Sequence, residues 1–174
     1  MDSLIHPHMN YSGVRAVIKA YFGKIRSKVT IDIGFGDVVE PIEKSLPLIH
    51  LSKVALFEST IRLSCYPKEF IFAEKLETLV FRKQLNSRMK DFHDLHSLIS
   101  LSASQPFRNL NEVLKAVFEH RQTPLNLPIT FAKEDIEQLQ KLWSAYLKTL
   151  RIQSLPSNIA EILLKINEWL LTHL

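Results

Sequence analysis

The chain has 174 residues, of which 46% are hydrophobic and 23% are charged, proportions that are ordinary for a globular protein. No apolar run approaches the roughly 18 residues that would cross a bilayer, and the opening residues lack the basic and then apolar pattern of a secretory signal. The single cysteine, Cys65, excludes an internal disulfide and favours a reducing cytoplasm. A formal charge of +4 is compatible with a nucleotide or nucleic-acid ligand.

Alternating hydrophobic residues predict two strands in the first third of the chain. Residues 14–22 and 29–35 are hydrophobic at every second position, the period of a half-buried strand. The polar segment 23–28 between them contains Gly23, so we expect a hairpin. Asp32 then lies on the polar strand face beside Gly34 and Gly36, which let a ligand or another backbone come close.

The same hairpin carries an unbroken series of positive charges. Between Tyr11 and Lys28 the sequence has no acid and five cations, namely Arg15, Lys19, Lys24, Arg26 and Lys28. The series indicates either a basic surface for phosphates or simply a solvated strand face.

The rest of the chain changes from strands to helices. Residues 42–66 are ambiguous, with short strands expected at 49–54 and 60–65. From Pro67 the hydrophobic period becomes helical, and we predict helices over residues 68–85, 88–101, 109–120, 133–149 and 157–172. Strands followed by helices favour an α+β fold, which we divide into residues 1–66 and 67–174.

Two charged groups in the first two predicted helices are candidates for chemistry. Lys75 and Arg82 are seven residues apart, which places both cations on one helix face, where they could hold phosphate oxygens. The alternative is a solvated helix face with Glu74 and Glu77 nearby.

The segment 88–95 packs four charges into about one helical turn. Lys90 can pair with Asp94, and Arg88 with Asp91, so the segment is either a charged first turn or part of a site. His93 and His96 follow at a spacing of three, but no third ligand is evident, and packed or surface histidines are favoured over a metal site.

Several segments stand in the order found in one protein family. They are residues 11–15, 29–37, 66–69, 72–77, 86–95 and 118–125, together with the region of Trp143. The strings IDIGFGD and NSRMKDFHDL are specific in combination. From about residue 11 onward, the chain resembles the nucleotidyltransferase AbiEii/AbiGii toxin family.

The resemblance implies a fold, a reaction and partners. The fold would be a nucleotidyltransferase-like partial sheet followed by a C-terminal helical bundle. The reaction would be metal-dependent transfer of a nucleotide from a nucleoside triphosphate, in some members to the end of a tRNA, by positioning and charge neutralisation with Mg²⁺. Such toxins are usually paired with an antitoxin, and no membrane partner is implied.

The resemblance also implies roles for individual residues. Asp32 matches a strand carboxylate of the metal site, and Lys75 matches a helix lysine on the triphosphate. Asp91 and Asp94 match the aspartates of the family's fourth motif and, with Lys75, would be catalytic. The implied phosphate partners are Arg82, Arg88 and Lys90.

The sequence departs from the family pattern at its first motif. The resemblance implies a Gly-Gly or Gly-Ser turn and a D-x-D pair ahead of the first strand, but the sequence contains neither, and Asp2 is the only acid before Asp32. We therefore expect a truncated chain that is weakly active or inactive alone, or one completed by a separately encoded N-terminal piece. The alternative is a non-enzymatic RNA- or nucleotide-binding remnant, or a protein that pairs with a full-length toxin.

Overall fold

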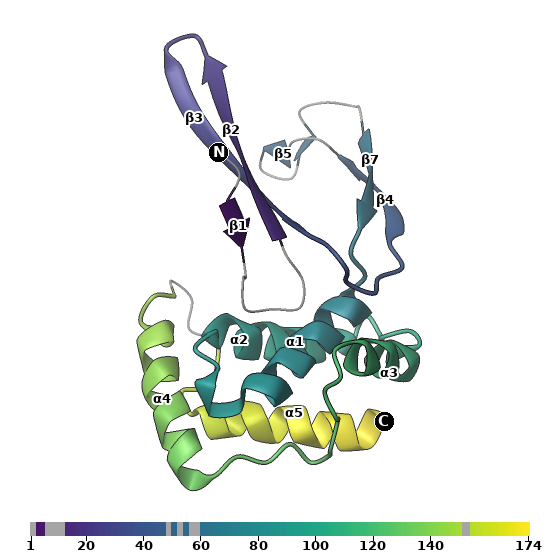
Figure 1. Ribbon diagram of the computed structural model, residues 1–174, viewed down its shortest axis with the longest axis vertical. Helices are drawn as coiled ribbons and strands as arrows, with labels where there is room; N and C mark the ends of the chain where they lie inside the picture. Colours follow the sequence, from purple (N-terminus) through teal and green to yellow (C-terminus); the bar gives the residue numbers. More distant parts are fainter. Residues whose placement is uncertain (1–2, 6–12, 48–49, 52–53, 56–59, 151–153) are drawn as a thin grey trace. The chain divides into compact units, whose positions relative to one another are not determined.

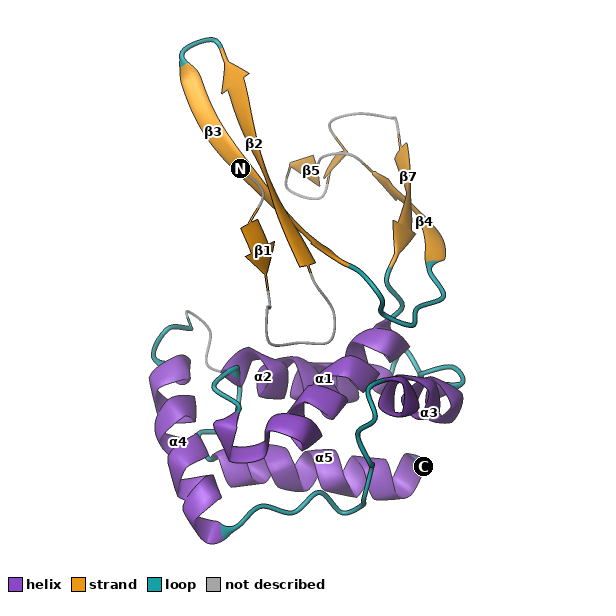
Figure 2. Cartoon of the chain, viewed as in Figure 1, coloured by secondary structure: helices purple, strands orange, loops and turns teal. Residues whose placement is uncertain are grey.

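The computed structural model describes residues 3–5, 13–47, 50–51, 54–55, 60–150 and 154–174. The described strands lie between Ser3 and Cys65, and the described helices follow from Lys68 (Figures 1 and 2). This order confirms the predicted α+β class. Residue contacts divide the chain into two units, residues 1–38 and 39–174, and the predicted division at residue 66 stays a prediction.

The first unit is an antiparallel sheet of strands β1 (Ser3–Ile5), β2 (Gly13–Phe22) and β3 (Ile25–Gly34), in the order β1-β2-β3. The predicted hairpin is confirmed, but its turn is shorter than predicted. Only Gly23 and Lys24 separate the strands, and the φ of 59° at Gly23 is readily adopted by glycine. Strand β3 starts at Ile25 and not at residue 29 as predicted. Ile25 lies on the same strand face as Val29 and extends the apolar side of the hairpin.

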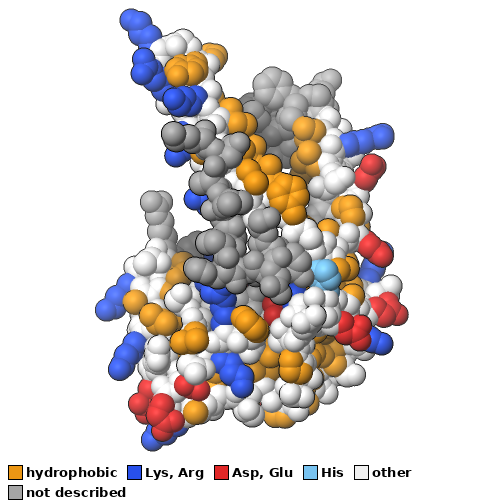
Figure 3. Space-filling model, in the orientation of Figure 1, with side chains coloured by type: hydrophobic (Ala, Val, Ile, Leu, Met, Phe, Trp, Pro, Cys, Tyr) orange, Lys and Arg blue, Asp and Glu red, His pale blue; other side chains and the backbone are white. Residues whose placement is uncertain are grey.

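The two faces of the hairpin differ in chemistry. One face is almost wholly apolar, and most of its larger side chains are exposed within this chain: Ile18, Phe22, Ile25, Val29, Ile31 and Ile33. The other face carries Arg15, Lys19, Tyr21, Arg26, Lys28 and Asp32. Lys and Arg side chains gather at the hairpin tip, beside hydrophobic ones (Figure 3).

The second unit begins with two short antiparallel pairs. Strand β4 (Ile42–Pro47) pairs with β7 (Thr60–Cys65), and β5 (His50–Leu51) pairs with β6 (Val54–Ala55). The strand predicted at 60–65 is confirmed. The single strand predicted at 49–54 is wrong, because β5 and β6 share this region, and Ile49 lies outside the described residues. Strand β4 was not predicted.

Five described helices complete this unit: α1 (Lys68–Arg82), α2 (Met89–Ser102), α3 (Leu110–His120), α4 (Lys133–Leu147) and α5 (Ile159–His173), with the 3₁₀ turn η1 (Lys83–Leu85) after α1. Helix α1 packs against α2 and α3, and α5 packs against α2 and α4 (Figure 1). None of the described helices has the length and apolar character needed to cross a membrane.

The core is the set of apolar stripes that the helical period predicts. Its fully buried side chains include Phe72, Leu76, Leu79, Phe92, Leu95, Leu139, Trp143, Ile159, Ile162 and Leu170. All five helices contribute buried residues to one cluster, so the position of α1 relative to α2 and α4 is fixed by packing.

Replacing a leucine of this core should cost far more stability than replacing a surface leucine. Leu95 of α2 is completely buried, whereas Leu164 of α5 is 57% exposed. We expect Leu95→Ala to lower the free energy of unfolding by about 2–5 kcal/mol, because it removes buried methyl groups and leaves a cavity. Urea unfolding measures the loss, with Leu164→Ala as the matched control; equal losses in the two variants would contradict the packing described.

Candidate functional site

A lysine of α1 is held between two carboxylates of α2. The Lys75 ammonium lies 3.0 Å from Oδ1 of Asp91 and 2.7 Å from Oδ2 of Asp94. The Asp91 side chain is only 5% exposed, and those of Lys75 and Asp94 are 21% and 24% exposed. The structure thus brings together the three residues that the resemblance implied to be catalytic. Their roles in a reaction stay predictions.

Two further cations flank this cluster on the same helix turn. Lys90 Nζ lies 2.9 Å from Oδ2 of Asp94, and Arg88 Nε lies 3.5 Å from Oδ2 of Asp91. Both side chains are more than half exposed, so they can move to meet a ligand. Asn86 fixes the start of the turn, because its side-chain oxygen accepts a 2.9 Å hydrogen bond from the Arg88 N–H.

The charges of the cluster reinforce one another. Burial alone would lower the pKa of Lys75, but the hydrogen bonds and charges of Asp94 and Asp91 outweigh it and raise the pKa. Burial alone would raise the pKa of Asp94, but the hydrogen bonds and charges of Lys75 and Lys90 lower it. Lys75 and Asp94 are therefore both ionised at neutral pH.

The cluster opens onto a cavity of about 430 Å³. Lining residues are Lys75, Ser87, Arg88, Met89, Lys90, Asp91, Leu142 and Tyr146. The α1–α2 side of the cavity carries the charges, while α4 supplies an aliphatic and an aromatic side chain. A cavity of this size, with a few convergent polar groups, is typical of a small-molecule site.

Three predicted site residues are not among the residues that line this cavity: Asp94, which contacts Lys75, and also Arg82 and Asp32. Arg82 is partly buried at the end of α1 and is not among the residues lining the cavity. Asp32 belongs to the other unit, and Arg15 donates to both of its carboxylate oxygens, at 2.6 and 2.8 Å. The predicted convergence of Asp32 with Lys75 and Asp91 stays a prediction.

The described residues of this chain do not supply a cluster of metal ligands. Among them, no group of three or more His, Cys, Asp or Glu side chains could hold a metal ion, and Asp32 binds the Arg15 guanidinium. His93 Nδ1 lies 2.8 Å from the Tyr146 hydroxyl, and His96 Nε2 lies 3.2 Å from Lys165 Nζ. The two histidines thus contact different partners.

The sequence patterns missed a second buried ion cluster, on another part of α1. Arg121 Nη1 lies 2.9 Å from Oε2 of Glu77, and the Thr123 hydroxyl donates to Oε1 of Glu77 at 2.6 Å. Glu77 is 4% exposed. Its position four residues after the buried Ala73 was the available signal, because an acid on an apolar stripe needs a buried partner.

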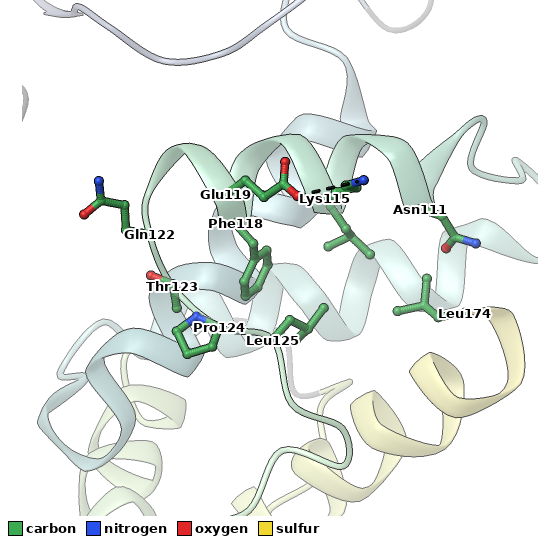
Figure 4. A pocket seen from close by; sticks show the side chains of 10 residues that line it. Asn111, Lys115, Phe118, Glu119, Gln122, Thr123, Pro124, Leu125 and Leu174 are labelled. Carbon is green, nitrogen blue, oxygen red and sulfur yellow. Dashed lines mark ion pairs between the residues drawn. The ribbon is translucent and has the colours of Figure 1, made fainter.

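A second cavity, of about 720 Å³, lies beside α3 and Leu174, the residue that follows α5 (Figure 4). Its lining is mostly apolar and includes Phe118, Pro124, Leu125 and Leu174. The ion pair at its edge joins Lys115 to Glu119 at 3.9 Å, both largely exposed. It has no set of convergent buried charges among its lining residues, so the Lys75 cavity is the better candidate for chemistry.

Comparison with known protein families gives a match over most of the chain. Residues 2–165 match the family described as "Nucleotidyl transferase AbiEii toxin, Type IV TA system". No curated protein and no solved structure matches the chain. The match covers more than half of the chain and includes every residue of the Lys75 cavity.

The contacts of His96 predict a loss of stability in mild acid. Burial lowers the pKa of His96, as do the nearby charges of Lys165 and His93. The unfolded chain therefore binds a proton at His96 more readily than the folded protein, so this stability is complete above a pH of about 6.5 and falls as the pH decreases below it. Ser100 faces the same lysine, with its hydroxyl 2.8 Å from Lys165 Nζ.

We expect His96→Gln to reduce the fall in melting temperature between pH 7.5 and pH 5.5, because glutamine does not titrate. Thermal unfolding of wild type and variant at both pH values measures the difference. The exposed His120, replaced by glutamine, serves as the control. If His96→Gln and wild type lose the same number of degrees, the environment assigned to His96 is wrong.

Proposed function

The chain belongs to the nucleotidyl transferase AbiEii toxin family, and from this membership we propose that its Lys75 cavity binds the phosphates of a nucleoside triphosphate. The observation that carries the proposal is the partly buried Lys75 ammonium, held by Asp91 and Asp94 at the edge of a cavity. A lysine has three N–H donors, and the two aspartates engage two of them. The third remains for a phosphate oxygen.

The proposed roles of the surrounding residues follow from their exposure. Asp91 and Asp94 position Lys75, because they bind it in the absence of a ligand. Arg88 and Lys90 lie at the cavity with exposed side chains, so they can exchange a carboxylate contact for a phosphate contact. Arg82 would assist only if a longer ligand extended along α1.

Membership in a toxin–antitoxin family implies a nucleotide substrate and an antitoxin partner in general, and nucleotidyltransferases generally use a divalent metal. Among the described residues there is no cluster of three or more potential metal ligands, and Asp32 pairs with Arg15, so no step of this proposal involves a metal ion held by this chain. We propose that transfer, for example to tRNA, needs further carboxylates that the described residues do not supply. The action would be cytoplasmic, where nucleoside triphosphates and tRNA are found.

We expect the chain alone to bind nucleoside triphosphates but to transfer little or no nucleotide to tRNA. Lys75→Gln should weaken triphosphate binding by roughly ten- to a hundredfold, because a charge-assisted hydrogen bond is lost. Titration calorimetry with ATP measures the affinity, and incubation of labelled nucleoside triphosphate with total tRNA and Mg²⁺ measures transfer.

The matched control is Lys115→Gln, because Lys115 is an exposed helix lysine with a carboxylate neighbour. Lys75→Gln leaves the buried Asp91 carboxylate without its lysine partner, so the melting temperature of this variant must also be measured. A second variant, Lys75→Arg, tests whether a retained positive charge rescues binding. Equal ATP affinity of Lys75→Gln and Lys115→Gln would refute the assigned site. Robust transfer by the wild-type chain alone would refute its dependence on other carboxylates.

One observation favours a second candidate function, binding of RNA by the hairpin. Lys19 and Lys28 are directly opposed in the β2–β3 register, next to the pair Tyr21 and Arg26. Opposed like charges destabilise a hairpin, and a phosphate backbone between them would offset that cost. An aromatic ring among the cations adds a surface on which a base can stack.

If the hairpin binds RNA, replacing Lys19 and Lys28 together with glutamine should weaken tRNA binding and reduce its salt dependence. Loss of two phosphate contacts lowers the slope of log K against log salt by about 1.4 to 1.8. Filter binding at several salt concentrations measures the slope. The control replaces the exposed α4 residues Lys133 and Lys141, which changes the net charge equally; identical slopes in the two double variants would exclude the hairpin surface.

A further inference from the structure

The Lys75 cavity has a second wall that the phosphate proposal does not use. This wall is formed by Leu142 and Tyr146, which lie one turn apart on α4. Their side chains are apolar and aromatic, whereas the lining residues of α1 and α2 are mostly charged. A polyphosphate is charged throughout and gains nothing from contact with apolar side chains. The base of a nucleotide is a flat, poorly hydrated ring system that can pack against them. The lining as a whole therefore suits a ligand with one charged end and one aromatic end.

The Tyr146 ring is held in place from two sides. Its hydroxyl lies 2.8 Å from His93 Nδ1, and its ring centroid lies 5.5 Å from that of Trp143, with an interplanar angle of 33°. Trp143 is completely buried and donates a 2.9 Å hydrogen bond from Nε1 to the Pro156 carbonyl. The ring is thus ordered before a ligand arrives, which reduces the entropy lost on binding.

The hydroxyl of Tyr146 is engaged and uncharged. Burial raises its pKa, and so does the negative charge of Asp94, so the ring carries a phenol at neutral pH. Because its oxygen lies at hydrogen-bond distance from His93, the hydroxyl has little capacity left to form a specific hydrogen bond with the edge of a base. It offers mainly the face or edge of its ring.

We infer that Tyr146, with Leu142 beside it, is the surface against which the base of the bound nucleotide packs. This inference rests on the proposed function, since it assumes that Lys75, Arg88 and Lys90 take the phosphates. Contact with an aromatic ring tolerates every base. The site should therefore accept all four bases and prefer purines, whose larger ring system covers more of the wall.

The test separates the base from the phosphates by using two probes. Titration calorimetry compares ATP and CTP with inorganic tripolyphosphate, which has no base, on the full chain and its variants. Tyr146→Leu keeps an apolar side chain but removes the ring, and Tyr146→Phe keeps the ring but removes the hydroxyl. Phe81→Leu, at a 72% exposed aromatic residue of α1, is the matched control.

We expect Tyr146→Leu to weaken ATP binding about tenfold, CTP binding less, and tripolyphosphate binding not at all. Tyr146→Phe and Phe81→Leu should bind ATP within about twofold of wild type. Unchanged ATP affinity in Tyr146→Leu would overturn the inference, and so would an equal loss for ATP and tripolyphosphate, which would indicate a structural effect.

The outcome also separates this inference from the proposal on which it rests. If Lys75→Gln weakens the binding of both probes while Tyr146→Leu weakens the binding of neither, the phosphate site is supported and the base site is refuted. If the wild-type chain binds tripolyphosphate and ATP equally well, the base makes no contact and the inference again fails. If wild type binds neither probe, the proposed function fails, and the base site fails with it.

Discussion

The contact of Lys75 with Asp91 and Asp94 is the interaction on which the candidate site depends. It joins α1 to α2 across their interface and gives the nearly buried Asp91 carboxylate a cation. A buried carboxylate without such a partner would be strongly destabilising. The same contact that stabilises this helix pair therefore places one ammonium at a fixed point of the cavity, so ligand binding does not have to order it.

Helix α1 carries a second buried acid that is neutralised in the same way. Glu77 binds Arg121 and Thr123 from the segment after α3, while the Lys75 cluster lies between α1 and α2. A helix anchored by two ionic clusters, as well as by its apolar stripe, cannot rotate without unpairing a buried charge. The Glu77 cluster thus has a structural role, and it leaves the Lys75 cluster as the part of α1 that faces a cavity.

The sequence was informative where one period ran through a whole element. The helices end within about three residues of prediction, and the β2–β3 hairpin formed with a shorter turn. Strand β4 was not predicted because the face that carries Ile42 and Leu46 also carries Lys44, which hides the two-residue period. Spacing within α2 predicted the Lys90–Asp94 pair, but no local pattern could reveal Tyr146 as a cavity wall, because it lies 53 residues from His93 in the chain.

The charge balance of the cavity limits what it can do unaided. Three cations, Lys75, Arg88 and Lys90, face two carboxylates, Asp91 and Asp94, which leaves a formal excess of only one positive charge against a triphosphate. The carboxylates that fix Lys75 also weaken its pull on an anion. Phosphate contacts alone would therefore give modest affinity, and the apolar α4 wall matters because it adds binding energy that does not depend on charge. Under the proposed function, the nucleotide would be bound at both ends, and each wall would contribute part of the affinity.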